Sequence, residues 1–596
     1  MSWYSGDGEV QEMTIERFAG VDFSTDPTKV DPIRSPDACN MIADATYFPV
    51  KRTGYRRILS FGAPIYGMHR LGDHTLVHAG TRMFRMLDSS AVTLYQDMAE
   101  APSRSFRMNG RLWILDGTTY LVYDGVQIVP VRSCAFVPTT TIGASPKGGG
   151  TSLEAVNLLT PYRINTFVGD GTAKTFQLDC RDIDEGSVTC ADYPIASVNA
   201  ARGTVTFASA PEDGEGLANV VIRFAKTVPE YSGKIDRCRI FGLYGGSNDT
   251  RVFVSGDPQE PNCDWQSGLY DPSYFPDTGY TRVGADASAI MGYLRHYDTQ
   301  LVLKEDGQDA KQYLRTFSLD ENNRPAYSLK QGAEAFGAVS MSAFGELAGI
   351  PMYLSASGVM GVFGTYVTDQ RMISGVSHWI DKRLTREENL QNAIFCVWRD
   401  RLYLAVNGHC YVADGRQVTD SVPEWYYWDN IPATCFLSGE SGLWFGTRDG
   451  RVCKFCSESD EDAYLDDGEA ICARWSTPFT ALGSWNKSKS ILAFYPVLMP
   501  YRRSSAEITY QTERGRERAE DILLTMFSFA QFSFSRLSFR TVAAAVPIPV
   551  LRRKNRVFLF QGIVSNREPR EPFGMLGLVI RYTQGGLMKG KRRKQT

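Results

Sequence analysis

The residue pair best suited to metal or redox chemistry is Cys453 and Cys456, which are separated by two residues. A structural zinc site needs four ligands, and these usually come from two such pairs. The chain has no second pair with this spacing. Side chains alternate between the two faces of a strand, so the run RVCKFC directs the two thiols to opposite faces. We therefore expect packed or idle thiols and no metal, because free cysteine behaves as a small hydrophobe.

Three histidines, His69, His74 and His78, lie within ten residues of one another. His74 and His78 have the same parity, so on one strand they would share a face. A metal site would need both imidazoles and further ligands converging on them. We expect ordinary strand and turn histidines here.

Two further clusters have side chains that bind ligands in other proteins. Residues 457–469 (SESDEDAYLDDGE) are rich in carboxylates, but they lack the fixed alternation and the distal glutamate of a calcium loop. We expect a solvated acidic loop. The run Trp425–Trp428 (WYYW) has aromatic rings that stack on sugars or bases in other proteins. It lies between Pro423 and Pro432, and we expect it to pack inside the fold.

Basic residues are concentrated late in the chain. They are Arg502, Arg503, Arg514, Arg516, Arg518, Arg552, Arg553, Lys554 and the tail 589–596 (KGKRRKQT). Such residues contact phosphates when they are clustered on one surface. The whole chain has 64 Lys and Arg against 67 Asp and Glu, a net charge of −3. It therefore has no global basic field for nucleic acid, and a solvated face explains the cluster equally well.

Enzymatic activity has no support from sequence motifs. The chain has no Gly-x-Ser-x-Gly elbow, Walker loop or His-Glu-x-x-His motif. A glycosidase needs two carboxylates about 5–10 Å apart, and sequence alone does not place them. We expect no enzyme, no catalytic residues, no cofactor and no metal.

The elements that would position any site are β-hairpins. Residues 392–456 contain two similar units in which apolar and aromatic residues alternate at period two. Asn407-Gly408 and Asp449-Gly450 fall where tight turns require a positive φ. Each unit is therefore predicted to be an antiparallel meander with one buried face.

Similar units recur along the chain, at residues 65–87, 104–123, 236–255, 293–316 and 346–364. Meanders that recur at this spacing are typical of β-propeller blades. We expect an all-β protein containing a propeller of about six to eight blades. The two best helical signals are short, at Asp37–Ile42 and Lys382–Asn392.

Composition divides the chain into four kinds of segment, as expected for 596 residues. An extended N-terminal arm (1–60) precedes the blades, which occupy 61–138 and 231–457. A small β-sandwich (139–230) is inserted between two blades, after the linker-like run TTTIGASPKGGG. A C-terminal β-sandwich or jelly-roll with a basic tail occupies 470–596, and its clearest strand pattern is FSFAQFSFSRLSFRTV.

The chain has no sign of export or of a membrane span. Its first residues, MSWYSGDGEVQEM, are polar, and no stretch approaches the ~20 apolar residues that cross a bilayer. The 12 cysteines are scattered through strand-like runs. This distribution is typical of reduced thiols in a protein made in a cytosol.

The sequence of the arm resembles that of virion proteins of the tailed-bacteriophage tail nozzle or hub type. The resemblance lies in the runs FAGVDFSTDPTKV, SPDACNM and KRTGYRRI. The blade segments CRIFGLYGG, SASGVMGVFG and EWYYWDNIPATCF resemble the same group, as does RWSTPFTALGSWNKSKS near the end. The resemblance covers most of the chain and includes no catalytic motif. The insertion at 139–230 departs from the family pattern.

The resemblance implies a β-propeller structural protein, typically six copies in a ring that extends the DNA exit conduit below the portal and its adaptor. Its partners would be further copies of itself, the portal–adaptor, other tail proteins and fibres. Genomic DNA would pass through without specific binding. The protein would be made in the host bacterial cytoplasm and reside in the virion tail. One alternative is a receptor-binding or fibre-anchoring tail protein, and a less favoured one is a propeller glycoside hydrolase.

Overall fold

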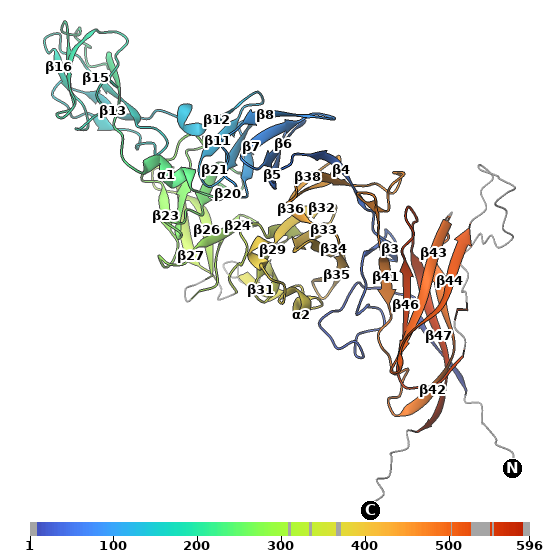
Figure 1. Ribbon diagram of the computed structural model, residues 1–596. Coiled ribbons are helices and arrows are strands. Elements are labelled where there is room, and N and C mark those ends of the chain that lie inside the picture. The colour runs from blue at the N-terminus through green and yellow to red at the C-terminus, as the bar shows by residue number, and fades with distance from the viewer. Residues whose placement is uncertain are drawn as a thin grey trace, which may run out of the picture. The chain divides into compact units, whose positions relative to one another are not determined.

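The computed structural model describes residues 9–307, 311–332, 336–364, 371–501, 503–525, 549–550 and 553–587. These residues are nearly all in β-strands and connecting loops, so the expected all-β class is confirmed (Figure 1). The chain divides into two compact units: residues 1–64 with 342–596, and residues 65–341. Within the described part, no helix is long and apolar enough to cross a membrane.

The unit formed by residues 65–341 contains four antiparallel meanders, each with four strands in sequence order. The meanders are β5 (Ile65–Leu71), β6 (His74–Ala79), β7 (Arg82–Met86) and β8 (Ala91–Tyr95); β9 (Arg104–Met108), β10 (Arg111–Leu115), β11 (Tyr120–Tyr123) and β12 (Ile128–Pro130); β20 (Ile240–Tyr244), β21 (Arg251–Ser255), β22 (Cys263–Gln266) and β23 (Tyr280–Arg282); and β24 (Ile290–His296), β25 (Thr299–Lys304), β26 (Gln312–Leu319) and β27 (Pro325–Gln331). A sheet with one buried face needs a neighbour, and the second and third meanders share one apolar core.

The other unit continues the series. Its meanders are β28 (Phe344–Leu347), β29 (Ile350–Ser355), β30 (Gly358–Gly364) and β31 (Arg371–Gly375); β32 (Ile394–Trp398), β33 (Arg401–Val406), β34 (His409–Thr419) and β35 (Val422–Trp428); and β36 (Ala433–Gly439), β37 (Gly442–Thr447) and β38 (Arg451–Phe455). The last meander takes its fourth strand from the arm, because β4 (Tyr55–Ser60) pairs antiparallel with β38. Two short strands, β39 (Leu465–Asp466) and β40 (Glu469–Ala470), extend the same sheet.

The turn residues have the backbone conformation that the sequence predicts. Asn407 and Gly408 have φ of 49° and 84°, and Gly450 has φ of 86°. These are left-handed conformations that glycine adopts without steric cost, and asparagine adopts more readily than most residues. Both hairpin turns are therefore confirmed.

Residues 139–225 form two sheets with a core of their own. One sheet has the order β14 (Thr151–Ser152), β13 (Thr139–Ala144), β15 (Tyr162–Phe167) and β19 (Val220–Ala225). The other has the order β16 (Thr175–Gln177), β18 (Thr204–Phe207) and β17 (Ile195–Asn199). Their core is mostly aromatic and aliphatic and includes Phe167, Phe176 and Phe207, and Figure 1 shows β13, β15 and β16 grouped together.

One stretch inside the expected insertion does not belong to its core. Leu158 and Leu159 are buried with Phe106, Trp113 and other residues of the β9–β12 and β20–β23 meanders. Asn157 donates two hydrogen bonds from its side chain to backbone carbonyls in the same region. The range 139–230 therefore includes a stretch that packs in the meander core, because a short apolar run between strands does not reveal which core buries it.

The C-terminal residues form two four-stranded sheets. The first has the order β1 (Val10–Ile15), β47 (Met575–Leu587), β42 (Lys487–Leu498) and β45 (Lys554–Val557), so the arm contributes an edge strand. The second has the order β41 (Ala473–Ser476), β46 (Phe560–Asn566), β43 (Arg503–Thr512) and β44 (Gly515–Thr525). A Cβ added to Gly562 of β46 would lie within 3 Å of the Phe494 ring of β42, so the sheets pack face to face there. The phenylalanine-rich run 526–541 lies outside the described residues.

The arm contains β1, β4 and the hairpin of β2 (Met41–Ala43) with β3 (Pro49–Lys51). Of the two short helical signals, the first is not helical. Residues 37–42 are not helical, because Asn40 has φ of 56° and β2 begins at Met41. The described helices of α type are α1 (Tyr231–Asp236) and α2 (Asp381–Leu384), and only α2 overlaps a predicted segment.

Candidate functional site: the arm junction

The two cysteines of the Cys-x-x-Cys pair are both buried. Burial raises the pKa of the Cys453 thiol to about 12 and also raises the pKa of Cys456. A thiol is a nucleophile or metal ligand only as the thiolate, so both are held in the inert form. Among the residues that the structure describes, no group of three His, Cys, Asp or Glu side chains is placed to hold a metal.

The structure brings together a different pair of histidines from the one that sequence parity suggested. His69 Nε2 and His78 Nδ1 each lie 2.9 Å from Ser103 Oγ, while His74 Nδ1 lies 2.8 Å from the Tyr123 hydroxyl. The cause is the antiparallel pairing of β5 with β6, which places His69 opposite Leu76 and near His78. Burial lowers the pKa of His69 to about 3 and that of His78 to about 4, so both rings are neutral at pH 7.

The acidic run 457–469 is only partly a solvated loop. Glu458 and Glu461 are exposed, as expected. Asp466, however, is 3% exposed and forms an ion pair with Arg52. The expectation failed at this residue because its partner is 414 residues away in the chain.

The aromatic run Trp425–Trp428 is buried within β35. The indole of Trp425 donates to the carbonyl of Val376 at 2.9 Å, and the indole of Trp428 donates to the carbonyl of Met41 at 3.0 Å. These rings are packing elements, and one of them holds the arm in place.

The late basic residues are mostly paired where they are described. Arg503 contacts Glu571 at 2.5 Å, Arg518 contacts Asp521 at 2.7 Å and Lys554 contacts Glu517 at 2.5 Å. Arg514 lies 3.8 Å from Glu513. Arg502, Arg552 and the tail 589–596 lie outside the described residues.

The structure concentrates its unusual chemistry where the arm meets β35, β39 and the C-terminal sheets. We call this region the arm junction and define it by arm residues 18–54 and the residues that they contact.

Gly20 has φ of 78°, and a Cβ there would lie 2.4 Å from the Trp425 carbonyl oxygen. Val21 donates its backbone N–H to that same oxygen at 2.8 Å. Asp22 then accepts the backbone N–H groups of Ser24 and Thr25. Each residue of the Gly-Val-Asp run therefore has a specific structural role.

The centre of the arm junction is Arg52, which is 1% exposed. Its guanidinium forms a bidentate ion pair with Asp466, with nitrogen–oxygen distances of 2.7 and 2.6 Å. Its Nε donates to Asn40 Oδ1 at 2.9 Å, and Asn40 Nδ2 donates to Asp429 Oδ1 at 2.5 Å. Burial by itself would lower the pKa of Arg52, but the Asp466 carboxylate raises it. Charge-assisted bidentate bonds of this kind fix geometry as well as adding energy.

A second buried ion pair joins Arg34 of the arm to Glu424 of β35, again through two nitrogen–oxygen contacts. The Arg34 guanidinium also lies 3.8 Å from the centre of the Trp379 ring. A third cation, Lys51, donates from Nζ to Asn566 Oδ1 at 2.8 Å. Burial lowers the pKa of Lys51 to about 8.

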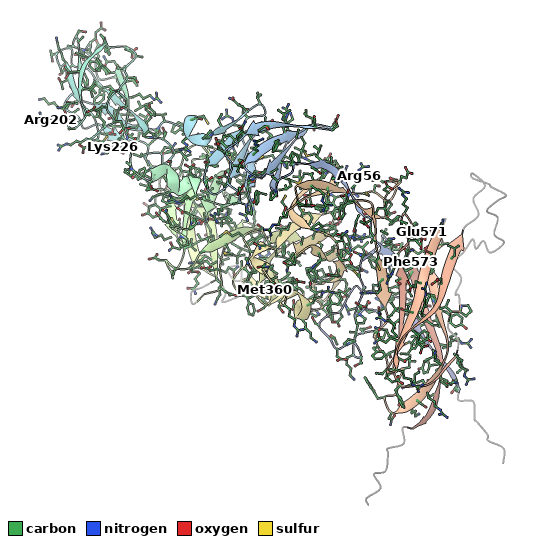
Figure 2. The ribbon with its side chains drawn as sticks, viewed as in Figure 1. Arg56, Arg202, Lys226, Met360, Glu571 and Phe573 are labelled. Atoms are coloured by element: carbon green, nitrogen blue, oxygen red, sulfur yellow. The ribbon has the colours of Figure 1, made fainter. Side chains whose placement is uncertain are left out.

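The backbone of the arm ties it to the C-terminal sheets at several points. Cys39 and Arg474 exchange both backbone hydrogen bonds, and the Lys51 N–H donates to the Phe573 carbonyl at 2.7 Å. Figure 2 shows Phe573 and Glu571 beside these sheets. Gly54 has a close approach that only glycine permits, since a Cβ there would lie 1.8 Å from the Leu465 carbonyl oxygen. The arm junction therefore holds the meander strands, β39 and the C-terminal sheets in one register.

Sequence reasoning placed no site here and missed Asp466, Asp429 and Glu424 as partners. The signal was present in the arm itself, where Asn40, Arg52 and Gly54 stand among short, unusual runs. Among the described residues, the arm junction has no group of three His, Cys, Asp or Glu side chains placed to hold a metal.

Comparisons with known proteins add no identity. No protein-family model and no curated protein sequence matches the chain. Solved structures match weakly: the computationally designed Ika8 protein at 10% identity covers 67% of this chain and 98% of its own, with a TM-score of 0.29. BBS1N in complex with ARL6DN is 10% identical, with 69% of this chain and 99% of that chain covered and a TM-score of 0.30. PorZ of Porphyromonas gingivalis, a surface component of the type-IX secretion system, is 11% identical, with 83% of this chain and 65% of that chain covered and a TM-score of 0.26. At these TM-scores the likenesses carry no argument.

Proposed function

We propose that this chain is a non-enzymatic structural component of a tailed-bacteriophage virion, of the tail nozzle or hub type. The observation that carries the proposal is the arm junction. The arm runs that resemble this family include the residues that the arm junction uses: Gly20 and Asp22, Asn40, and Arg52 with Gly54. The residues that carry the resemblance are therefore the ones that anchor the arm.

The proposal includes a β-propeller. The described residues contain seven four-stranded meanders once β4 is counted with β36–β38. In a propeller, a strand from early in the chain commonly completes the last blade, and this pairing closes the ring of blades. The pairing of β4 with β38 supports this arrangement, and the proposal assigns one blade to each meander.

A conduit for DNA needs rigidity more than chemistry. Buried ion pairs contribute little net free energy of unfolding, but breaking one by removing a partner is costly. The arm junction therefore favours one register of arm, meanders and C-terminal sheets over others. A nozzle that transmits load during genome ejection would use this specificity.

DNA would pass through the conduit without being held. The chain has 64 Lys and Arg against 67 Asp and Glu. Tight phosphate binding would need many clustered cations and would retard a moving genome. A near-neutral or acidic wall would let DNA slide.

A second role, fibre anchoring or receptor binding, is favoured by the inserted sheets. Residues 139–225 bury their own core, including Phe167 and Phe176, and therefore need little from the meanders. Insertions at exposed loops are where proteins commonly add attachment functions. In the proposal the inserted sheets serve attachment while the rest of the chain forms the conduit.

The purified chain provides the test. We expect ring-shaped oligomers with a central opening by negative-stain electron microscopy, and weak DNA binding whose affinity falls steeply with salt. We also expect no metal dependence and no release of reducing sugar from polysaccharides. Nanomolar or sequence-specific DNA binding at physiological salt would contradict the conduit, and polysaccharide turnover would place the chain among the enzymes.

A further inference from the structure

An open cavity of about 430 Å³ lies between the arm and α2. Its lining includes Phe23 and Pro27 from the arm, and Lys382, Arg383 and Arg386 from α2 and the residues just after it. We call it the basic pocket. None of these three cations forms an ion pair with another described residue, although the Arg383 guanidinium stacks 3.7 Å from the centre of the Tyr427 ring.

The two carboxylates that line the basic pocket are already satisfied by other donors. Asp22 Oδ1 accepts two backbone N–H groups. Glu387 accepts hydrogen bonds from His409, Tyr411 and Asn407. Burial would raise the pKa of Glu387, but these bonds lower it to about 2. The lining of the pocket thus has three cations against two carboxylates, and its positive excess attracts an anion from outside.

The same unit carries the complementary charge on a different surface. Glu458 and Glu461, which follow β38, are exposed and form no ion pair within the described residues. In Figure 1, α2 and β38 lie at opposite edges of the meanders of this unit, so the two surfaces do not meet within one chain. Two different complementary surfaces on one chain are what a head-to-tail interface requires, and such an interface forms a ring when the rotation between successive copies closes.

We propose that the basic pocket receives the carboxylates of Glu458 and Glu461 from a second copy of this chain. The inference rests on the ring of the proposed function and names the contact that builds it. Charge pairs across an interface steer association and fix its register. Lys382 and Arg386 are the exposed cations of the pocket, and Arg383 is held in place by its stacking on Tyr427.

The test reverses charge on each surface. The pocket variant is Lys382→Glu with Arg386→Glu, and the loop variant is Glu458→Lys with Glu461→Lys. Matched controls are Arg202→Glu and Glu185→Lys, which reverse exposed charges on the inserted sheets; Figure 2 marks Arg202. Sedimentation velocity measures association, and thermal unfolding verifies that each variant is folded.

Each variant is expected to weaken association by about tenfold or more, because like charges would then face each other. The controls should leave association unchanged, and the variant with all four reversals should recover most of it. An equimolar mixture of the pocket and loop variants should also recover association, because the intact loop of one meets the intact pocket of the other and the two reversed surfaces attract each other.

Three results would overturn the inference. If charge reversal leaves the ring intact, the inferred contact is wrong but the proposed function stands. A wild-type chain that stays monomeric across a concentration series would overturn both. A pocket variant that assembles normally but no longer retains a DNA duplex would assign the pocket to nucleic acid instead.

Discussion

The arm junction and the inserted sheets bury their side chains in different ways. The arm junction buries charges: Arg34, Arg52 and Asp466 are each at most 5% exposed and are paired with partners hundreds of residues away. The inserted sheets bury an aromatic core that includes Phe167 and Phe176, with all members from residues 144–224.

The difference separates stability from specificity. Apolar burial is non-directional and scales with area, so a local aromatic core stabilises its own sheets whatever surrounds them. A bidentate ion pair has a fixed geometry and is costly to leave half made. The arm junction thus specifies a long-range arrangement, whereas the inserted sheets form a local unit.

The largest expected effect comes from breaking the central ion pair. Arg52→Ala leaves Asp466 buried without its partner and should lower the free energy of unfolding of this unit by about 3–5 kcal/mol. Urea unfolding, with hydrogen exchange of β4 and β35 as the local readout, measures the loss. Arg56→Ala is the matched control, because Arg56 is exposed on the neighbouring strand β4. Equal losses in the two variants would show that the ion pair has no special role.

The second prediction compares loss of the inserted sheets alone with loss of both these sheets and the stretch that contains Leu158 and Leu159. Replacing 151–228 by a Gly/Ser linker removes Leu158 and Leu159 from the meander core and should cost at least about 4 kcal/mol, at about 2 kcal/mol or more for each leucine. Replacing 139–153 and 161–227 by separate short linkers keeps both leucines and should leave the rest of the chain as stable as before. Chemical denaturation of the two variants distinguishes them. Equal stability would mean that the leucines do not anchor this segment.

These two cases also show what sequence could and could not predict. The meanders were predictable because their turns are local: Asn407-Gly408 and Gly450 specify hairpins by backbone preference alone. The arm junction was not, because Arg52 and Asp466 are 414 residues apart and Asp466 stands in an acidic run that looks solvated. Leu158 was misplaced for a related reason, since an apolar residue in a loop does not reveal its core.

A third expected effect concerns polar groups that are buried without charge. His69 and His78 have pKa values of about 3 and about 4, below the value near 6.5 of an unfolded histidine. At a pH between the folded and unfolded pKa values, the unfolded state binds more protons than the folded state. The contribution of these neutral histidines to the free energy of unfolding is therefore fully present above pH 6.5 and is lost as the pH falls toward 4. At pH 5 the loss should be about 2 kcal/mol for each histidine. Hydrogen exchange of β5 and β6 at pH 7 and pH 5 measures it.

The control for this prediction replaces both rings. A His69→Gln, His78→Gln variant should be less stable at pH 7 but should show a smaller decrease between pH 7 and pH 5. A slope identical to that of the wild type would show that other groups cause the pH dependence.

The smallest expected effect separates backbone strain from a steric clash. Gly450→Val should cost at least about 1 kcal/mol, because a β-branched residue is strained at positive φ. A Cβ there would also lie 2.7 Å from the Ala63 carbonyl oxygen, whereas a Cβ at Gly408 would contact nothing within 4 Å. Gly408→Val, which carries the strain alone, should therefore cost less. Thermal unfolding of both variants gives the order, and a larger loss at Gly408 would contradict it.

The central claim is that this chain is part of a phage tail conduit. Electron microscopy of purified virions that carry an affinity-tagged copy of the chain, decorated with a gold label, tests it most directly. The account predicts label around the tail axis, below the portal and its adaptor. Label only at the tips of fibres would support the receptor-binding alternative, and purified virions without label would contradict the proposed function.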